Sequence, residues 1–283
     1  MQMSGAAVAD ALHAASEGDE DRSWELITQL WLHGGSHALD AAARLGHRPE
    51  PTHRALAADV LGQLGAAPGR AAVDGPFRDD ALLLLLDMVR DERDPVVLHS
   101  IAIGFAHIGD QRCVAHLVRL HGHPDAEVRK GVAFALLGRP ETAALEALMT
   151  LSTDDEPEVR DWATFGLARE TDQDFPRLRD ALAARLGDDD LDVRAEAIHG
   201  LAVRADARAM RPLLHALEAP QHRGDNDFII AEALYALAAA TADPRLYPYL
   251  VADRDEWVTD APDEDLPPLM RAALARYAPT RER

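Results

Sequence analysis

The stretch EPEVRDWATFGLA, residues 156–168, carries the pattern that decides the fold. Its apolar and small residues fall at positions 0, 4, 7 and 8, namely Val159, Ala163, Gly166 and Leu167. Residues with this spacing share one face of an α-helix, so the stretch predicts a helix with a single buried stripe. The acidic residue that opens the stretch suits a helix N-terminus, where a carboxylate can accept from exposed amides.

The same pattern occurs six times along the chain. Position 0 of the six copies is occupied by His53, Val97, Val128, Val159, Val193 and Ile229. Neighbouring copies are 31 to 44 residues apart, and a second helical segment lies between them. This repeat length is typical of a solenoid built from helix pairs. We therefore predict an all-α fold in which each pair packs on its neighbours.

Two further positions repeat with the stripe. Position 7 is small in five copies, which lets a partner helix approach closely, at Gly104, Ala135, Gly166, Gly200 and Ala236. Three residues before position 0, an acidic or amide side chain is expected to cap each helix, at Glu50, Asp94, Asp125, Glu156, Asp190 and Asn226.

The shared pattern, Asp/Glu-x-x-Val-Arg-x-x-Ala-x-x-Ala-Leu, resembles the HEAT-repeat family, in particular the short HEAT-like repeats first described in phycobilisome lyases. The stretch EVRDWATFGLA is similar to segments of actinobacterial HEAT-repeat proteins. The resemblance covers residues 50–250 and implies a right-handed α-solenoid with the Val-Arg helices on its concave side. It also implies a structural role, linking neighbouring turns, for four arginines: Arg54, Arg129, Arg160 and Arg194.

The resemblance suggests three parts of the chain. Residues 1–49 are expected to form N-terminal helices that cap the array, and residues 50–250 the repeat array itself. Residues 251–283 are expected to form an acidic loop followed by a capping helix. The loop is expected to contain Asp253, Asp255, Glu256, Asp260, Asp263, Glu264 and Asp265.

Composition restricts the classes of partner. The formal net charge is −20, and Lys130 is the only lysine among 29 basic residues. Such a chain repels phosphate, which disfavours nucleic acid and anionic membrane surfaces, and attracts basic proteins. A single cysteine, Cys113, permits no internal disulfide and suits a reducing compartment. The N-terminal sequence has no signal-peptide pattern, and no apolar run is long enough to span a membrane, so we expect a cytoplasmic protein.

A column of side chains opposite the stripe is the candidate site. Position 6 points roughly 145° away from the buried stripe, where solvent is expected. Rings occupy it in four successive copies, at Phe134, Phe165, His199 and Tyr235. Asp161, Trp162, Glu196 and Glu232 lie at the neighbouring positions 2 and 3. Rings beside carboxylates favour a cationic guest, so these eight residues are predicted to line a binding groove. The alternative is that the rings pack on adjacent helices.

The sequence contains no motif for a cofactor or for catalysis. The histidines, including His121 and His123, do not have the spacing of a zinc site, and the C-terminal acids lack the glycine of a calcium loop. Phosphate-binding glycine loops, serine elbows and zinc-protease patterns are also missing. We therefore expect no metal, no cofactor and no catalytic residue. Acid–base work by Asp161, Glu196 and Glu232 would require that they converge.

These observations favour a protein interaction scaffold or adaptor, not an enzyme, that binds a basic partner segment in the concave groove. One alternative is an acidic inhibitor, such as an immunity protein, which would neutralise a basic toxin by mimicking phosphate. Another is a HEAT-like enzyme such as a DNA glycosylase, which the net charge disfavours. The sequence leaves the oligomeric state open.

Overall fold

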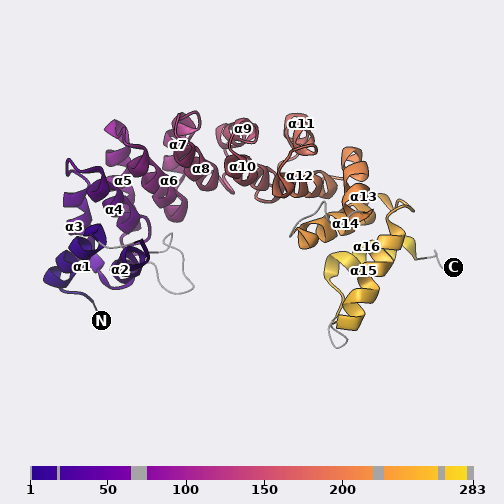
Figure 1. The fold of residues 1–283 in the computed structure, drawn as a ribbon, viewed down its shortest axis with the longest axis horizontal. Helices are drawn as coiled ribbons and strands as arrows, with labels where there is room; N and C mark the ends of the chain where they lie inside the picture. Colours follow the sequence, from indigo (N-terminus) through magenta and orange to yellow (C-terminus); the bar gives the residue numbers. More distant parts are fainter. Residues whose placement is uncertain (1, 18–19, 65–74, 219–225, 261–264, 279–283) are drawn as a thin grey trace. The chain divides into compact units, whose positions relative to one another are not determined.

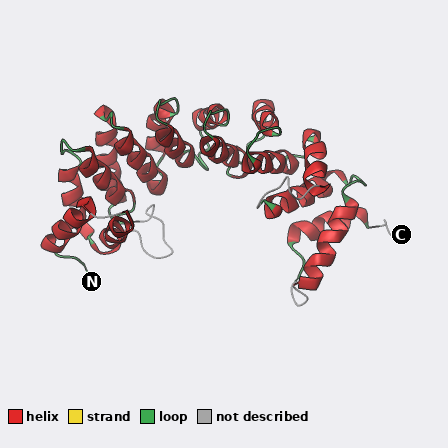
Figure 2. Ribbon diagram, in the orientation of Figure 1, coloured by secondary structure: helices red, strands yellow, loops and turns green. Residues whose placement is uncertain are grey.

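The computed structural model describes residues 2–17, 20–64, 75–218, 226–260 and 265–278. In these ranges the chain consists of helices joined by turns and loops, without a strand (Figures 1 and 2). Successive helix pairs stack as the repeat pattern predicts, so the fold is an α-solenoid. Contacts divide the chain into two compact units, Met1–Leu151 and Ser152–Arg283.

The first unit begins with three helices that precede the repeats. Its helices are α1 (Gly5–Glu17), α2 (Glu20–His33), α3 (Gly35–Leu45), α4 (Pro51–Gly62), α5 (Arg78–Asp91), α6 (Pro95–Ile108), α7 (Val114–Leu120), α8 (Ala126–Ala135) and α9 (Thr142–Leu151). The three repeat helices α4, α6 and α8 pack side by side in chain order. We call these and their counterparts in the second unit the inner helices.

The second unit continues the same alternation. Its helices are α10 (Pro157–Arg169), α11 (Pro176–Arg185), α12 (Leu191–Val203), α13 (Met210–Glu218), α14 (Asp227–Thr241), α15 (Tyr247–Asp260) and α16 (Pro268–Tyr277). Short 3₁₀ turns precede α7 and α13. The inner helices α10, α12, α14 and α16 pack in that order, so the last helix extends the row of repeat helices.

The predicted stripe forms the core. The four valines at position 0, Val97, Val128, Val159 and Val193, are fully buried. In the last copy Ile229 is only half-buried, and its neighbour Ile230, 1% exposed, fills the core instead. His53 is half-buried at the same position of the first copy, as expected for a side chain with a polar ring.

The predicted helix caps are confirmed for aspartate and wrong for the other residues. Asp94, Asp125 and Asp190 each accept hydrogen bonds from two backbone amides of the first helical turn. Glu50 and Glu156 make no such bond, because glutamate has an extra methylene and is a poor cap. Asn226 has φ −94° and ψ 22°, outside the extended region that a capping residue adopts. Its Nδ2 donates to Asp192 Oδ1 at 2.7 Å instead.

The expected acidic loop after residue 250 is largely helical. Helix α15 continues to Asp260, so Asp253, Asp255 and Glu256 are helical residues. Leu246, just before this helix, and Leu250 within it are fully buried, which supplies the apolar contacts that hold the helix in place. Because this segment is rich in acidic residues, its few apolar residues did not indicate a helix in the sequence. Asp263 and Glu264 lie outside the described residues.

The arginines that follow position 0, which we call the repeat arginines, have related contacts. In Arg160, Nη1 donates to the backbone oxygens of Asp154 at 2.9 Å and Asp155 at 3.1 Å. Its Nε and Nη2 hold the two carboxylate oxygens of Asp188 at 3.0 and 2.8 Å. Although burial opposes it, this pairing keeps the pKa of Asp188 below its usual value. Arg160 thereby ties α10 both to the loop before it and to the next repeat.

The other three repeat arginines share part of this arrangement. Arg54 donates to two carbonyls of the preceding loop and forms the same two-bond pair with Glu92, with distances of 2.7 and 3.0 Å. Arg129 donates to the carbonyls of His123 and Pro124. Arg194 donates to the carbonyl of Asp188. These contacts are of the kind that the resemblance implied.

The small residue at position 7 of α12 lies against two neighbouring helices. A methyl group added at Gly200 would lie 2.8 Å from Ala168 Cβ and 2.9 Å from Leu182 Cδ1. We expect Gly200→Ala to lower the free energy of unfolding by about 1–3 kcal/mol, because the helices must move apart. Urea unfolding followed by circular dichroism measures this. In the control Gly187→Ala no atom lies within 4 Å of the new methyl, so a change below about 0.5 kcal/mol is expected. Equal effects of the two changes would contradict the close-approach account.

Candidate functional site

An arginine outside the repeat pattern, Arg169, joins side chains from three inner helices of the second unit. Its Nε donates to both carboxylate oxygens of Glu196, at 3.1 and 2.8 Å. Its Nη1 donates to Glu232 Oε2 at 2.8 Å, and His199 Nε2 lies 3.7 Å from the same oxygen. The structure therefore brings three predicted site residues together on α12 and α14, around a cation from α10. We call Arg169, Glu196, His199 and Glu232 the charge cluster.

Burial controls the protonation of the charge cluster. The side chain of Glu196 is only 6% exposed, and burial raises its pKa to about 6 although Arg169 opposes the shift. Burial lowers the pKa of His199 to about 4, assisted by the positive charges of Arg169 and Arg204. His199 is thus neutral at pH 7. The charges of the cluster are therefore those of Arg169 and of the two acidic side chains that it contacts.

The charge cluster borders a cavity of about 490 Å³ and contains two unsatisfied polar atoms. Arg169, His199, Arg204 and Glu232 are among the residues that line this cavity. Arg169 Nη2 and His199 Nδ1 are buried without a hydrogen-bond partner in the described part of the chain. Arg169 already pairs with the carboxylates of both Glu196 and Glu232.

Asp161 on α10 has a different environment from the charge cluster. It is half-buried, and no basic side chain of the described residues lies within ion-pair distance. Burial, together with the carboxylates of Asp192, Asp190 and Glu158, raises its pKa to about 6. At pH 7 this side chain is therefore a carboxylate that other carboxylates repel.

The two aromatic side chains of α10 form a pair next to Asp161. The rings of Trp162 and Phe165 pack edge to face, with centroids 6.0 Å apart and an interplanar angle of 84°. Both residues are half-buried, so each ring keeps part of its surface accessible. Asp161, Trp162 and Phe165 are called the α10 surface below.

The expectation that position 6 faces solvent fails for two of its four rings. His199 and Tyr235 are each 8% exposed. Tyr235 turns toward α15, where its hydroxyl donates to the carboxylate of Asp253, and burial raises its pKa. Phe134 and Phe165 are half-buried. Phe134 belongs to the first unit, and Phe165, His199 and Tyr235 belong to the second. The predicted column is therefore compared with the structure only for the three rings of the second unit.

Sequence reasoning missed Arg169 and Arg204. Arg169 stands seven residues after Trp162, two helical turns away, so this spacing was a signal that the two side chains share a face. Arg204 follows α12 and donates to the carbonyls of Leu167, Ala168 and Thr171 at the end of α10. This contact could not be predicted from helical periodicity, because it joins residues more than 30 positions apart.

The two histidines of the HGH segment make local contacts. His121 Nδ1 contacts the carbonyl oxygen of Val118, and His123 Nδ1 accepts a hydrogen bond from the amide of Asp125. Both rings therefore contact the backbone within three residues of their own positions. Within the described ranges, no group of three or more His, Cys, Asp or Glu side chains is arranged to hold a metal ion. Among the same residues, no helix is both long and apolar enough to cross a membrane.

Comparison with known proteins places this architecture in a family. A family model described as HEAT repeats matches residues 82–168 and 146–238. Protein YibA of Escherichia coli, in strain K12 and in O157:H7, is 33% identical over 138 residues, which are 48% of this chain and 48% of YibA. The chain thus aligns with about half the length of these curated relatives.

Solved structures support the same fold. The X-ray structure of Escherichia coli YibA superposes with a TM-score of 0.70 and 22% identity, covering 95% of this chain and 91% of that one. An engineered protein superposes with a TM-score of 0.58 and 17% identity, covering 94% of this chain and 76% of its own. HEAT repeats generally mediate protein–protein interactions. Because the family model matches more than half of its residues, this chain belongs to the HEAT-repeat family.

Proposed function

We propose that this protein is an interaction scaffold whose α10 surface binds a basic segment of a partner protein. Membership in the HEAT-repeat family supports the general role, and the side chains of α10 support the choice of partner. The surface combines a carboxylate, Asp161, with the accessible parts of two rings, Trp162 and Phe165. Lysine and arginine side chains pair with carboxylates and stack on aromatic rings.

The observation that carries this proposal is the unneutralised charge of Asp161. Its neighbours Asp192, Asp190 and Glu158 repel it, whereas Glu196 and Glu232 are already paired with Arg169. A lysine or arginine from a partner would replace this repulsion with an ion pair. The net charge of −20 acts in the same direction over longer distances, because it speeds the approach of basic chains at low salt.

A selection from a random peptide library displayed on phage tests the proposal. The full-length protein is the bait, and Asp161→Lys is the counter-selected variant. We expect the recovered peptides to be enriched in lysine and arginine, and to bind the wild type at least ten-fold more tightly than Asp161→Lys. Asp87→Lys makes the same charge change on α5, at a side chain 56% exposed, and serves as the matched control. Recovered peptides without a basic bias would overturn the choice of partner.

The affinity for a selected peptide is also expected to depend on pH. Asp161 is charged above its pKa of about 6 and loses its charge as the pH falls through that value. The attraction is therefore present at pH 7.5 and reduced at pH 5. Calorimetric titration at both values, with lysine and arginine charged throughout, measures the difference. An affinity that rises on acidification would contradict the role of Asp161.

A further inference from the structure

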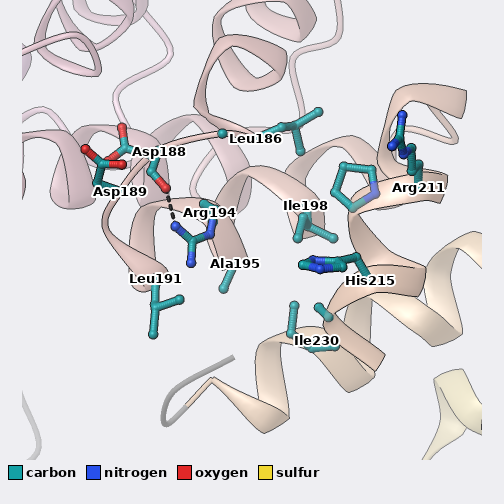
Figure 3. Close-up of a pocket in the computed structure, with 13 residues that line it drawn as sticks. Leu186, Asp188, Asp189, Leu191, Arg194, Ala195, Ile198, Arg211, His215 and Ile230 are labelled. Atoms are coloured by element: carbon teal, nitrogen blue, oxygen red, sulfur yellow. Dashed lines mark hydrogen bonds between the residues drawn. The ribbon is translucent and has the colours of Figure 1, made fainter. Parts of the chain in front are cut away.

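A second cavity of the second unit lies between repeats and shares no residue with the α10 surface or the charge cluster. Its volume is about 530 Å³, within the range of small-molecule sites, which is roughly 300–1,000 Å³. Figure 3 shows Arg194 beside the turn that carries Asp188, with Ile198, His215 and Ile230 on its other side. Arg211 also lines the cavity but points away from Arg194 in this view. The lining thus combines the two arginines with an apolar wall, and Asp188 and Asp189 form its acidic edge.

Two of the other repeat arginines bind a carboxylate of the next repeat, and this indicates the kind of group that Arg194 can bind. Both Arg54 and Arg160 form two parallel hydrogen bonds with a carboxylate of the next repeat, from Glu92 and Asp188 respectively. In the sequence these acids stand two residues before the capping position of the next inner helix. That position is occupied by Glu92, Asp154 and Asp188 after Arg54, Arg129 and Arg160, and by Gly224 after Arg194.

Arg194 therefore has the geometry of its counterparts without their acid. It donates through Nη1 to the backbone oxygen of Asp188, as the other repeat arginines do to their own loops. Within the described ranges, no carboxylate lies at ion-pair distance from its guanidinium. The carboxylate of Asp188 is held by Arg160 and by Arg185, so it does not serve Arg194.

We propose that this cavity binds a small organic acid, with its carboxylate on Arg194 and its apolar body against the cavity wall. The carboxylate takes the place that Glu92 and Asp188 take in the other repeats, where a planar guanidinium holds two oxygens at once. Ala195, Ile198 and Ile230 supply the apolar surface for an aliphatic chain. This site is independent of the proposed partner on the α10 surface.

The test uses 4-methylpentanoate as the probe and the full-length protein labelled with ¹⁵N-arginine. We expect a saturable shift of the Arg194 Nε–Hε resonance, assigned from the spectrum of Arg194→Lys. The methyl ester of the probe has the same apolar body without the charge, and inorganic phosphate has charge without the body. Each is expected to bind at least ten-fold more weakly than the acid. Equal binding of acid and ester, or a shift elsewhere with none at Arg194, would overturn the assignment.

Variants separate the site from its surroundings. Arg194→Gln is expected to reduce affinity for 4-methylpentanoate at least ten-fold, and Arg194→Lys less, since lysine keeps the charge and loses the planar fork. Arg90→Gln removes the same charge from an arginine 68% exposed on α5, and its affinity should equal that of the wild type. Asp225→Asn should stay within two-fold of the wild type. A large gain in affinity on that change would show that Asp225 occupies the fork and would overturn the proposal of an open site.

Discussion

Replacing Arg160 with alanine is expected to lower the free energy of unfolding by about 3–5 kcal/mol. The change removes two bonds to the preceding loop and both bonds to Asp188, whose side chain is only 5% exposed. Among the residues that the structure describes, the buried carboxylate then keeps Arg185 as its only cationic partner, at 3.2 Å, together with the backbone amide of Asp190 at 3.2 Å. Removing one member of a buried ion pair has costs of this size, because the remaining charge is left in a poorly solvated place. Urea unfolding of the full-length protein, followed by circular dichroism, measures the loss.

A more exposed ion pair of the same unit provides the control. Arg179 pairs with Asp174 at 2.6 Å, and their side chains are 27% and 43% exposed. Its second contact, with Asp206 at 3.5 Å, is longer, and Asp206 keeps Arg208 at 2.7 Å. Water screens such a pair, so Arg179→Ala is expected to lower the free energy of unfolding by no more than about 1 kcal/mol. If Arg160→Ala has no larger effect than Arg179→Ala, the repeat arginines do not link the turns of the solenoid in the way described.

Replacing Trp162 and Phe165 together with alanine is expected to weaken binding of the basic partner segment by about 100-fold. Aromatic side chains at the centre of an interface commonly contribute 2 kcal/mol or more, and the two effects are not additive because the rings contact each other. A 100-fold change corresponds to about 2.8 kcal/mol. Titration calorimetry with a peptide from the selection measures it.

Folding must be checked in this double variant, since both rings are half-buried. Far-ultraviolet circular dichroism and the thermal midpoint serve this purpose. The matched control replaces Trp24 and Phe228, which are 45% and 70% exposed on other helices, with alanine. The control should bind as the wild type does. The proposal that the α10 surface binds the partner would be contradicted if the double variant at residues 162 and 165 is folded and binds with the affinity of the wild type.

The sequence predicted the helices because their burial follows a local period. Val159, Ala163 and Leu167 lie on one face of one helix, and no distant residue is needed to recognise them. The part of α15 after residue 250 was expected to be a loop for the complementary reason. Its apolar contacts are few, and acidic residues fill the remaining positions, so composition outweighed the period around Leu250.

The candidate site could be predicted only in part, because its chemistry depends on contacts between distant positions. Periodicity placed Glu196 and Glu232 on inner helices, but their common partner Arg169 is 27 and 63 residues away in the sequence. Likewise, the direction of Tyr235 on its helix does not reveal that Asp253 of α15 covers it. A helical wheel gives the direction of a side chain on its own helix, but it does not show which residue of another helix that side chain contacts.

The most direct test of the central claim is photo-crosslinking from the α10 surface inside the source organism. A photoreactive phenylalanine analogue replaces Phe165, and a second version carries it at Leu83, which is 57% exposed on α5. After irradiation, mass spectrometry identifies the crosslinked proteins and the segments attached. We expect a protein crosslinked at residue 165, but not at residue 83, through a segment rich in lysine and arginine. The same products from both positions, or only acidic and neutral segments from residue 165, would contradict it.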